Sequence, residues 1–401
     1  MRFNVTIPAM LLLLAGTVHS CRHSGKNENT ARQILVDNQS RKDTADITGL
    51  IDSISVVQLK ESADYPITTP HQLYALGEKG YILFNIASNN KQALFFNKDG
   101  TFEKLVAKNG IREEDGVNFL DTYVDDKGMI VYDFAQCRIN IYDNDLQLKE
   151  IRKGKKLLHF SHLARIPNSD KYAAFANYNL GNPSATLLNT LTSDLDVDQT
   201  FLPYSKPFRN ILVLTYNNSF FRHGDSLRFT KHYDPGVYHV DVNGIAKVFD
   251  IRYAEGSMTS AQGDSIITEH LDKFDTHVRT PQELHTEMFN GFVFPYGAYL
   301  ENNRYIIFPS LSFVGKKRDG FMSIISKNTL KDTVSAKVMT DGKSLQGVLP
   351  PFMGYDHKTD EFLALATGYQ LKKGLDPGSP FQEKLGRLDL AGFYLIKVKF
   401  K

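Results

Sequence analysis

The stretch at residues 80–109, GYILFNIASNNKQALFFNKDGTFEKLVAKN, decides the fold because it reads as three short strands in a row. Residues 81–86 and 92–97 are apolar runs, and a turn at Asp99 and Gly100 leads into a third strand that opens at Thr101. Asp-Gly between β-rich runs is a strong hairpin signal, because glycine takes the positive φ that a tight turn needs. A meander of this size cannot bury both of its faces alone, so it needs neighbours like itself.

The chain contains such neighbours. A turn followed by a short apolar run recurs six times, with starts 43 to 79 residues apart, at residues 81–84, 129–132, 172–175, 226–229, 305–308 and 361–364. A period of roughly 40 to 50 residues is typical of the four-stranded blades of β-propellers. The sequence therefore predicts an all-β, six-bladed β-propeller over residues 49–401. The aromatic residues of the repeats are predicted to be core: Tyr81, Phe84, Tyr132, Tyr172, Phe175, Phe229, Tyr305 and Phe308.

Three segments lie outside the repeats. Residues 51–59 and 392–400 each look like a strand without a blade, and their pairing would complete the last blade and close the ring, which removes exposed sheet edges. Residues 280–283 form a capping-box pattern with proline at the first helical position, so a short helical insert is expected between blades four and five. Such an insert covers a binding face or braces a blade junction, and the sequence leaves both readings open.

The N-terminus has the features of an export signal. Arg2 precedes an apolar run at residues 7–16, which is too short to span a bilayer as a mature helix. Residues 1–20 are therefore predicted to be a signal peptide. Residues 21–48 are mostly polar, and we expect them to form a flexible tether.

Charge and composition narrow the class of partner. The 401-residue chain has 47 basic and 45 acidic residues, and the resulting net charge of +2 argues against recruitment by nucleic acid or by an anionic membrane surface. No nucleophile elbow, metalloprotease motif, phosphate loop or Cys-x-x-Cys pair occurs. The sequence therefore predicts no catalytic residue, no metal ligand and no cofactor.

Two groups of residues nevertheless carry side chains that could bind a metal or transfer protons. Histidines gather at His223, His232 and His239 and again at His270, His277 and His285, without the short fixed spacing of a metal site. The adjacent carboxylates Asp125 and Asp126 fall at a predicted turn, where neighbouring side chains diverge, so they are read as solvated turn charges.

A propeller offers one natural site, the central channel, at whose mouth loops from all blades converge. Aligning the inner turns places the start of five inner strands near His71, Phe119, His162, Phe294 and Pro350. His71 and His162 are the polar members and are predicted to face the mouth. Aromatic residues in the connections are the other candidates for binding: Tyr178, Tyr204, Tyr296 and Tyr369.

These features resemble a known family, the six-bladed β-propeller lipoproteins of Bacteroidota, which have a TolB-like or NHL-like architecture. The resemblance rests on residues 17–21, which are similar to a lipobox ending at Cys21, on the six repeats, and on residues 232–239 running into residues 248–251. It implies that Cys21 carries lipid and that the protein is an outer-membrane lipoprotein, with the periplasmic face favoured over the cell surface. Cys137 is then left without a disulfide partner and is read as a small buried hydrophobe.

The resembling family has no agreed activity, so three functions stay open. The first is a binding or scaffold module for an envelope protein or a glycan-like ligand. The second is a metal-dependent hydrolase or lyase with its site in the central channel, which needs no linear motif because several blades would each supply a ligand. The third is a structural subunit of a transport or secretion assembly.

Overall fold

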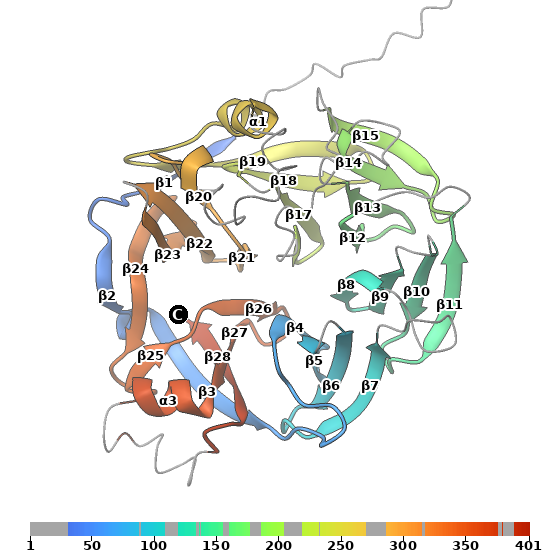
Figure 1. Cartoon of the computed structure of the whole chain (residues 1–401), viewed down its shortest axis with the longest axis horizontal. Coiled ribbons are helices and arrows are strands. Elements are labelled where there is room, and N and C mark those ends of the chain that lie inside the picture. The colour runs from blue at the N-terminus through green and yellow to red at the C-terminus, as the bar shows by residue number, and fades with distance from the viewer. Residues whose placement is uncertain are drawn as a thin grey trace, which may run out of the picture.

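Short strands joined by tight turns dominate the computed structural model of the chain (Figure 1). The structure describes residues 31–87, 90–108, 119–133, 136, 138–154, 160–176, 186–203, 219–231, 233–269, 286–314, 317–375, 379 and 389–401. Within these residues the strands form small sheets that stand side by side around a central axis, with β4, β8, β12 and β26 nearest the centre (Figure 1).

Three blades are separate four-stranded antiparallel meanders, each running from the centre outward. Blade one consists of β4 (Pro70–Ala75), β5 (Gly80–Ala87), β6 (Asn90–Asn97) and β7 (Phe102–Lys108). Blade two consists of β8 (Phe119–Asp125), β9 (Gly128–Asp133), β10 (Arg138–Tyr142) and β11 (Leu148–Lys153). Blade three consists of β12 (His162–Arg165), β13 (Tyr172–Phe175), β14 (Thr186–Leu191) and β15 (Val197–Pro203).

Blades four and five belong to one larger sheet, because a strand from the N-terminal region joins them. Blade four consists of β16 (Phe220–His223), β17 (Ser226–Thr230), β18 (Gly236–Asp241) and β19 (Gly244–Tyr253). Blade five consists of β20 (Val293–Pro295), β21 (Leu300–Glu301), β22 (Tyr305–Val314), β23 (Lys317–Ser326), β24 (Lys331–Asp341) and β25 (Gly347–Leu349).

Blade six combines the two ends of the chain. It consists of β26 (Phe352–Asp356), β27 (Glu361–Thr367), β28 (Phe393–Phe400) and, as its outermost strand, β3 (Ile51–Leu59). β28 pairs antiparallel with β3 from Phe393 opposite Leu59 to Phe400 opposite Ile51. The two strands that lay outside the sequence repeats are therefore hydrogen-bonded neighbours.

The turns explain why the meanders form where they do. Gly100 between β6 and β7 has a φ of +83°, and Gly128 between β8 and β9 has a φ of +119°. A Cβ on Gly128 would approach the carbonyl oxygen of Tyr142 to 2.2 Å. Only glycine fits this turn, which explains the Asp-Asp-Lys-Gly sequence at residues 125–128.

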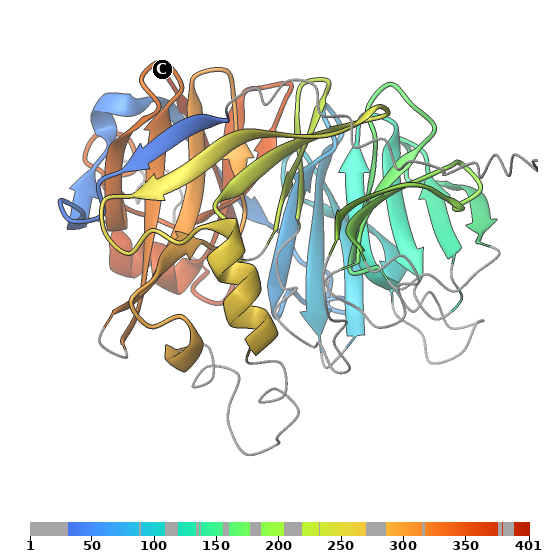
Figure 2. The same cartoon turned by 90° about the horizontal axis from the view of Figure 1, so that it is seen from above.

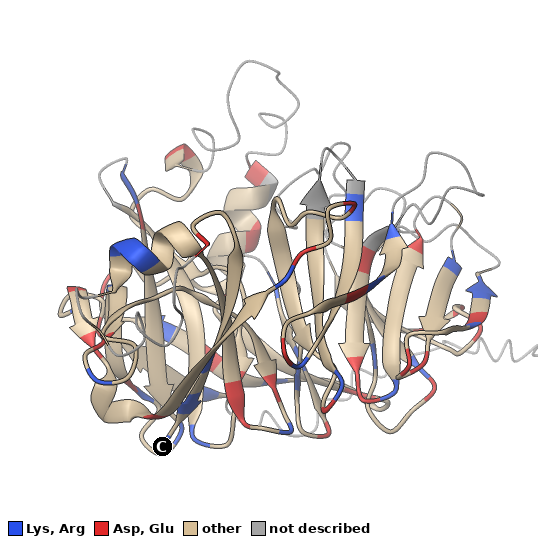
Figure 3. Ribbon diagram, turned by 90° about the horizontal axis from the view of Figure 1, so that it is seen from below, with Lys and Arg blue, Asp and Glu red and all other residues tan. Residues whose placement is uncertain are grey.

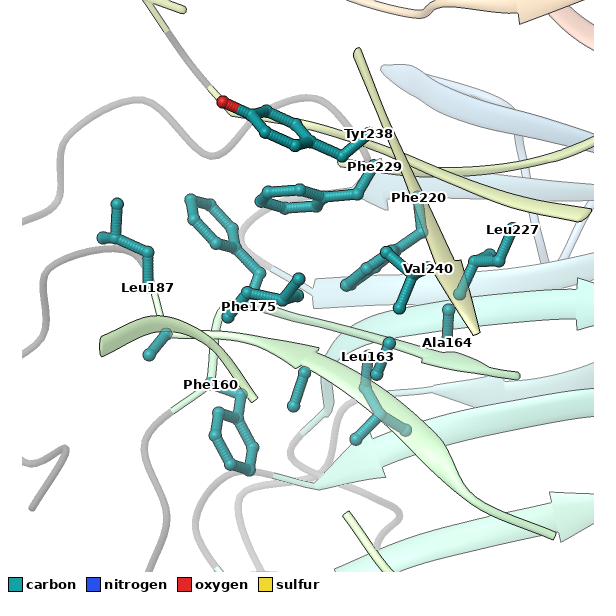
Figure 4. Packing of buried hydrophobic residues seen from close by; sticks show 14 of the residues in the cluster. Phe160, Leu163, Ala164, Phe175, Leu187, Phe220, Leu227, Phe229, Tyr238 and Val240 are labelled. Atoms are coloured by element: carbon teal, nitrogen blue, oxygen red, sulfur yellow. The ribbon is translucent and has the colours of Figure 1, made fainter. Parts of the chain in front are cut away.

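Aromatic and aliphatic side chains pack one blade against the next. Figure 4 shows Phe160, Leu163 and Phe175 of the blade-three side facing Phe220, Phe229 and Val240 of blade four. The rings of Phe175 and Phe229 lie 5.3 Å apart. Seven of the eight repeat aromatics that the sequence assigned to the core are buried, and Tyr305 is half-buried against the core cluster of blades five and six.

The expected tether at residues 21–48 is wrong for its described part. β1 (Arg32–Val36) pairs in parallel with β19, and β2 (Lys42–Asp46) pairs in parallel with β24. A short 3-10 helix, Thr48–Leu50, then leads into β3. Apolar residues decide the difference, because Ile34 and Val36 are at most 1% exposed and pack between blades four and five. Residues 34–36 are a short apolar patch in an otherwise polar segment, and the sequence analysis did not predict a strand from them.

The helices also differ from the expectation. α1 (Ser260–Glu269) follows β19 and precedes β20, whereas the capping-box residues 280–283 lie outside the described residues. α3 (Gly368–Gly374) follows β27, where the sequence analysis places no helix. Figure 2 shows α1 projecting from one face of the ring. No helix in the described part of the chain is both long and apolar enough to cross a membrane.

Acidic and basic residues lie mainly at strand ends and turns and are interspersed, as Figure 3 shows. This distribution agrees with the small net charge and leaves the strand interiors free for apolar packing.

Candidate functional site

The central cavity has a volume of about 610 Å³ and lies within the ring of inner strands. Five of the six blades contribute to it, through β4, β8, β16, the β20–β21 segment and β26 together with the inner turns that follow them. This volume is in the range of small-molecule sites.

Tyrosine and phenylalanine rings line much of the cavity wall. The tyrosines are Tyr74, Tyr123, Tyr296, Tyr299 and Tyr355, and the phenylalanines are Phe220, Phe221 and Phe352. The Tyr74 hydroxyl donates to the Thr122 carbonyl at 3.3 Å, and the Tyr355 hydroxyl donates to Asp360 at 2.6 Å. These bonds fix the ring orientations. The wall thus combines flat apolar faces with polar edges, which suits a ligand that has both apolar faces and hydroxyl groups.

Ion pairs surround the end of the cavity formed by the inner turns. Arg165 of blade three donates to both oxygens of Asp125 at 2.6 and 2.8 Å, and Arg222 of blade four binds the next residue, Asp126, in a two-bond pair. Since Asp125 and Arg165 are each about nine-tenths buried, the solvated turn charge predicted for Asp125 is wrong. The side chains do diverge, because each carboxylate holds an arginine from a different blade.

Glu301 of blade five is the third carboxylate at this end. It accepts hydrogen bonds from Arg228 at 3.0 Å, from Lys327 at 2.8 Å and from the Tyr299 hydroxyl at 3.1 Å. Burial alone would raise the pKa of Glu301, but the nearby cations, with Arg228 first, hold it below its usual value. The carboxylates Asp125, Asp126 and Glu301 are thus each paired with at least one cation.

The opposite end of the cavity is where the inner strands begin. His71 on β4 lines the cavity, and burial together with the nearby Lys91 lowers its pKa to about 4. His71 is therefore a neutral imidazole at pH 7 that can both donate and accept a hydrogen bond.

His162 does not face the mouth as predicted. It lies buried at the start of β12, with its Nδ1 3.2 Å from Oδ1 of Asp121 and its ring stacked on Phe175 at 6.2 Å. The second oxygen of Asp121 accepts from the Leu163 backbone N–H at 2.9 Å. His162 thus joins the inner strands of blades two and three, which is a structural position.

The other predicted candidates divide in three ways. Tyr296 lines the cavity between β20 and β21. Tyr369 lies on the first turn of α3, is 62% exposed and does not line the cavity. Tyr178, Tyr204 and the proposed lipid site Cys21 lie outside the described residues.

Sequence reasoning missed most of the polar residues at the inner-turn end, above all Arg222, Glu301 and His357. A signal was available, since each lies at or next to the end of an inner strand: Arg222 near the end of β16, Glu301 at the end of β21 and His357 just after β26. Aligning the ends of the inner strands, rather than their starts, would have grouped them.

No group of three or more His, Cys, Asp or Glu side chains that could hold a metal ion occurs among the described residues. Of the histidine groups weighed above, His223 lies 3.7 Å from Glu301 and His239 contacts Arg228 and Asp241. The other four histidines of the two groups, His232, His270, His277 and His285, lie outside the described residues.

Comparison with known proteins agrees with this architecture. The crystal structure of a Bacteroides fragilis NCTC 9343 protein that carries the assignment "exported protein" superposes with a TM-score of 0.69 at 14% identity, covering 92% of this chain and 99% of that one. A Bacteroides vulgatus member of the duf4221 family, at 9% identity, has a TM-score of 0.42 over 88% of this chain and 97% of the other. No curated protein matches the chain.

The DUF5128 family, described as a 6-bladed beta-propeller, matches residues 22–265, which is more than half of the chain. The four-stranded sheets around the axis and the repeat spacing agree with that description. The chain therefore belongs to the DUF5128 family of six-bladed β-propellers.

Proposed function

We infer that this protein is a non-enzymatic binding module that holds a small, glycan-like ligand in its central cavity. One observation carries the inference: five blades converge on a cavity of about 610 Å³ whose wall alternates aromatic rings with fixed polar groups. Binding residues gathered from separate repeats are a common use of propeller channels. An envelope protein as partner remains the alternative within the same binding role.

A glycan-like ligand fits this wall for two reasons. Pyranose rings have apolar faces that stack on tyrosine and phenylalanine, and their hydroxyl groups need the mixed donors and acceptors that His71, Tyr74 and Tyr355 offer. Each of the carboxylates Asp125, Asp126 and Glu301 is paired with a cation, so none of the three is left to select a cationic ligand.

A blocking substitution tests this role. Ala298 is half-buried on the cavity wall, so Ala298→Trp would fill the space that a ligand needs. Ala391→Trp is the matched control, because Ala391 is exposed outside the cavity. The experiment uses the Cys21→Ser chain, because this substitution removes the proposed lipid site and with it the need for detergent. Saturation-transfer NMR would measure its binding to a panel of mono- to hexasaccharides.

At least one saccharide is expected to bind the Cys21→Ser chain and the Ala391→Trp control but not the Ala298→Trp variant. Binding that survives Ala298→Trp would move the site elsewhere. A panel without any binder would count against a glycan-like ligand.

The location of the protein is part of the proposal. The lipobox-like residues 17–21 support export and lipid attachment at Cys21 in the outer membrane, with the domain in the periplasm, in a TolB-like or NHL-like ring closed by the β3–β28 pair. Incorporation of labelled palmitate that is lost in Cys21→Ser would support the anchor. Release of the wild-type protein in soluble, unlabelled form would contradict it.

A further inference from the structure

A second cavity of about 600 Å³ lies beside the central one, between blade five and blade six. We call it the lateral cavity. Its walls come from β22, β23, β24 and β25 on one side and from β26, β27 and α3 on the other.

The two cavities meet at a break in the inner strand of blade five. β20 pairs with residues 310–312 of β22 and β21 pairs with residues 306–307, so the inner strand is interrupted beside Pro309. Proline has no N–H to donate to an inner strand. The interrupting chain passes through Gly297, whose φ is +109°, and is held by the Tyr296 N–H, which donates to the Pro309 carbonyl at 2.8 Å.

Residues at this break line both cavities. Tyr296 and Pro309 border the central and the lateral cavity alike, as do Pro351 and Phe352 at the start of blade six. An unbroken inner strand would run between the two spaces here. The break thus leaves the two cavities side by side, with only these shared residues between them.

The lateral cavity is more apolar than the central one. Its walls include the buried side chains of Met322, Met339, Leu349 and Leu371. Two methionines on the neighbouring strands β23 and β24 give an adaptable surface, because their unbranched side chains repack around different shapes. Such a lining suits a flexible hydrocarbon chain.

We propose that the two cavities form one continuous site for an elongated amphiphile, with an uncharged, hydroxyl-rich head in the central cavity and its apolar chain in the lateral cavity. The proposal rests on the proposed function, because the head occupies the site described there. The cation-paired carboxylates Asp125, Asp126 and Glu301 favour an uncharged head, and the apolar walls between blades five and six favour a hydrocarbon tail.

Two glycosides with the same head group distinguish the joined site for head and tail from a glycan-binding central cavity alone. Octyl β-glucoside, used below its micelle concentration, supplies head and tail, and methyl β-glucoside supplies the head alone. Titration calorimetry on the Cys21→Ser chain is expected to give at least tenfold tighter binding for octyl β-glucoside. Equal affinities would overturn the joined site but leave a glycan-binding cavity, whereas binding of neither would overturn the joined site and weaken the proposed function as well.

A substitution in the lateral cavity makes the test local. Gly320 on β23 lines this cavity and pairs with Leu311, so an added side chain leaves the sheet on the Leu311 face. A Cβ at Gly320 would meet its nearest neighbour, Leu311, at 3.7 Å, so the backbone tolerates a side chain there. Gly49→Phe is the control, because no atom lies within 4 Å of a Cβ at Gly49.

Gly320→Phe is expected to reduce the affinity for octyl β-glucoside at least tenfold and to leave that for methyl β-glucoside within twofold. Gly49→Phe should change neither. Equal melting temperatures of the two variants would show that folding is retained. An unchanged affinity for octyl β-glucoside in a folded Gly320→Phe variant would overturn the proposal, as would octanol binding as tightly as octyl β-glucoside.

Discussion

One guanidinium nitrogen of Arg165 donates to both carboxylate oxygens of Asp125, in an ion pair between the inner strands of blades two and three whose side chains are both about nine-tenths buried. Asp126, the next residue, is 59% exposed on its side chain and pairs with Arg222 of blade four. Two adjacent carboxylates thus connect three blades at one end of the central cavity, in environments that differ sharply in solvent access.

This difference predicts unequal costs for two neighbouring substitutions. Asp125→Asn leaves the Arg165 guanidinium buried without its counter-charge, so we expect a loss of about 3 kcal/mol in unfolding free energy. Asp126→Asn removes a partly exposed pair and should cost about 1 kcal/mol or less. Urea unfolding of both variants measures the difference, and equal costs would contradict the burial of the first pair.

His71 should make stability depend on pH. Its pKa is about 4 in the folded protein against 6.5 in the unfolded chain, so the unfolded chain binds more protons between these values. Stability from this group is complete above pH 6.5 and is lost as the pH falls toward 4. The full pKa difference corresponds to about 3 kcal/mol, and screening at a half-buried site reduces it to about 1 to 2 kcal/mol.

The difference between wild type and His71→Gln isolates this effect from other titrating groups. Urea unfolding at pH 7 and pH 4.5 should show a smaller drop for His71→Gln than for wild type. A drop of the same size in both proteins would show that His71 is accessible to protons in the folded state.

The N-terminal strand β1 should contribute strongly to stability. Ile34 is 0% exposed and packs between blades four and five, whereas Leu35 is 44% exposed. Ile34→Ala is expected to cost about 2 to 4 kcal/mol, and Leu35→Ala about 0.5 kcal/mol or less. Thermal unfolding of the two variants provides the comparison, and two equally mild effects would restore the tether interpretation.

The inner strands of blades one and six approach each other closely, so adding a single methyl group between them should lower the stability of the protein. A Cβ on Gly354 of β26 would lie 2.3 Å from the carbonyl oxygen of Leu73 on β4. Gly354→Ala is therefore expected to cost about 3 kcal/mol or more, while Gly320→Ala, with 3.7 Å of room, should stay within about 0.5 kcal/mol. Melting temperatures would show this, and a neutral Gly354→Ala would mean that the two strands lie farther apart.

The repeat signals in the sequence were sufficient for the blades because each is local. The turn at Asp99 and Gly100 and the apolar runs beside it predict a meander from turn geometry and residue period alone. The first strands of blades two and three begin at Phe119 and His162, which are two of the inner-strand starts aligned from the sequence. α1 lies between blades four and five, where a helical insert was expected, but at other residues, and α3 was not predicted. Both helices begin with capping boxes, in which Gln262 and Gln370 return to the N-cap residues Thr259 and Thr367. A glutamine in that position is a weaker signal than the proline and glutamate at residues 281 and 283.

The site was less predictable, because its residues meet only through the ring. Arg165 and Arg222 reach Asp125 and Asp126 from 40 and 96 residues away, and no local pattern records such a contact. β1 was missed for a related reason. Its apolar residues are too few to indicate a strand by themselves. They are buried because β1 pairs with β19 and packs against side chains of blades four and five.

If lipid is attached at Cys21, the docking of β1 on blade four limits how far the propeller can lie from the membrane. Eleven residue steps separate Cys21 from Arg32, where β1 begins, so a chain anchored by lipid at Cys21 reaches at most about 40 Å even when fully extended. This connection is shorter than the tether expected over residues 21–48. It would hold the rim of blades four and five close to the bilayer and so bias which face of the ring meets a diffusing ligand.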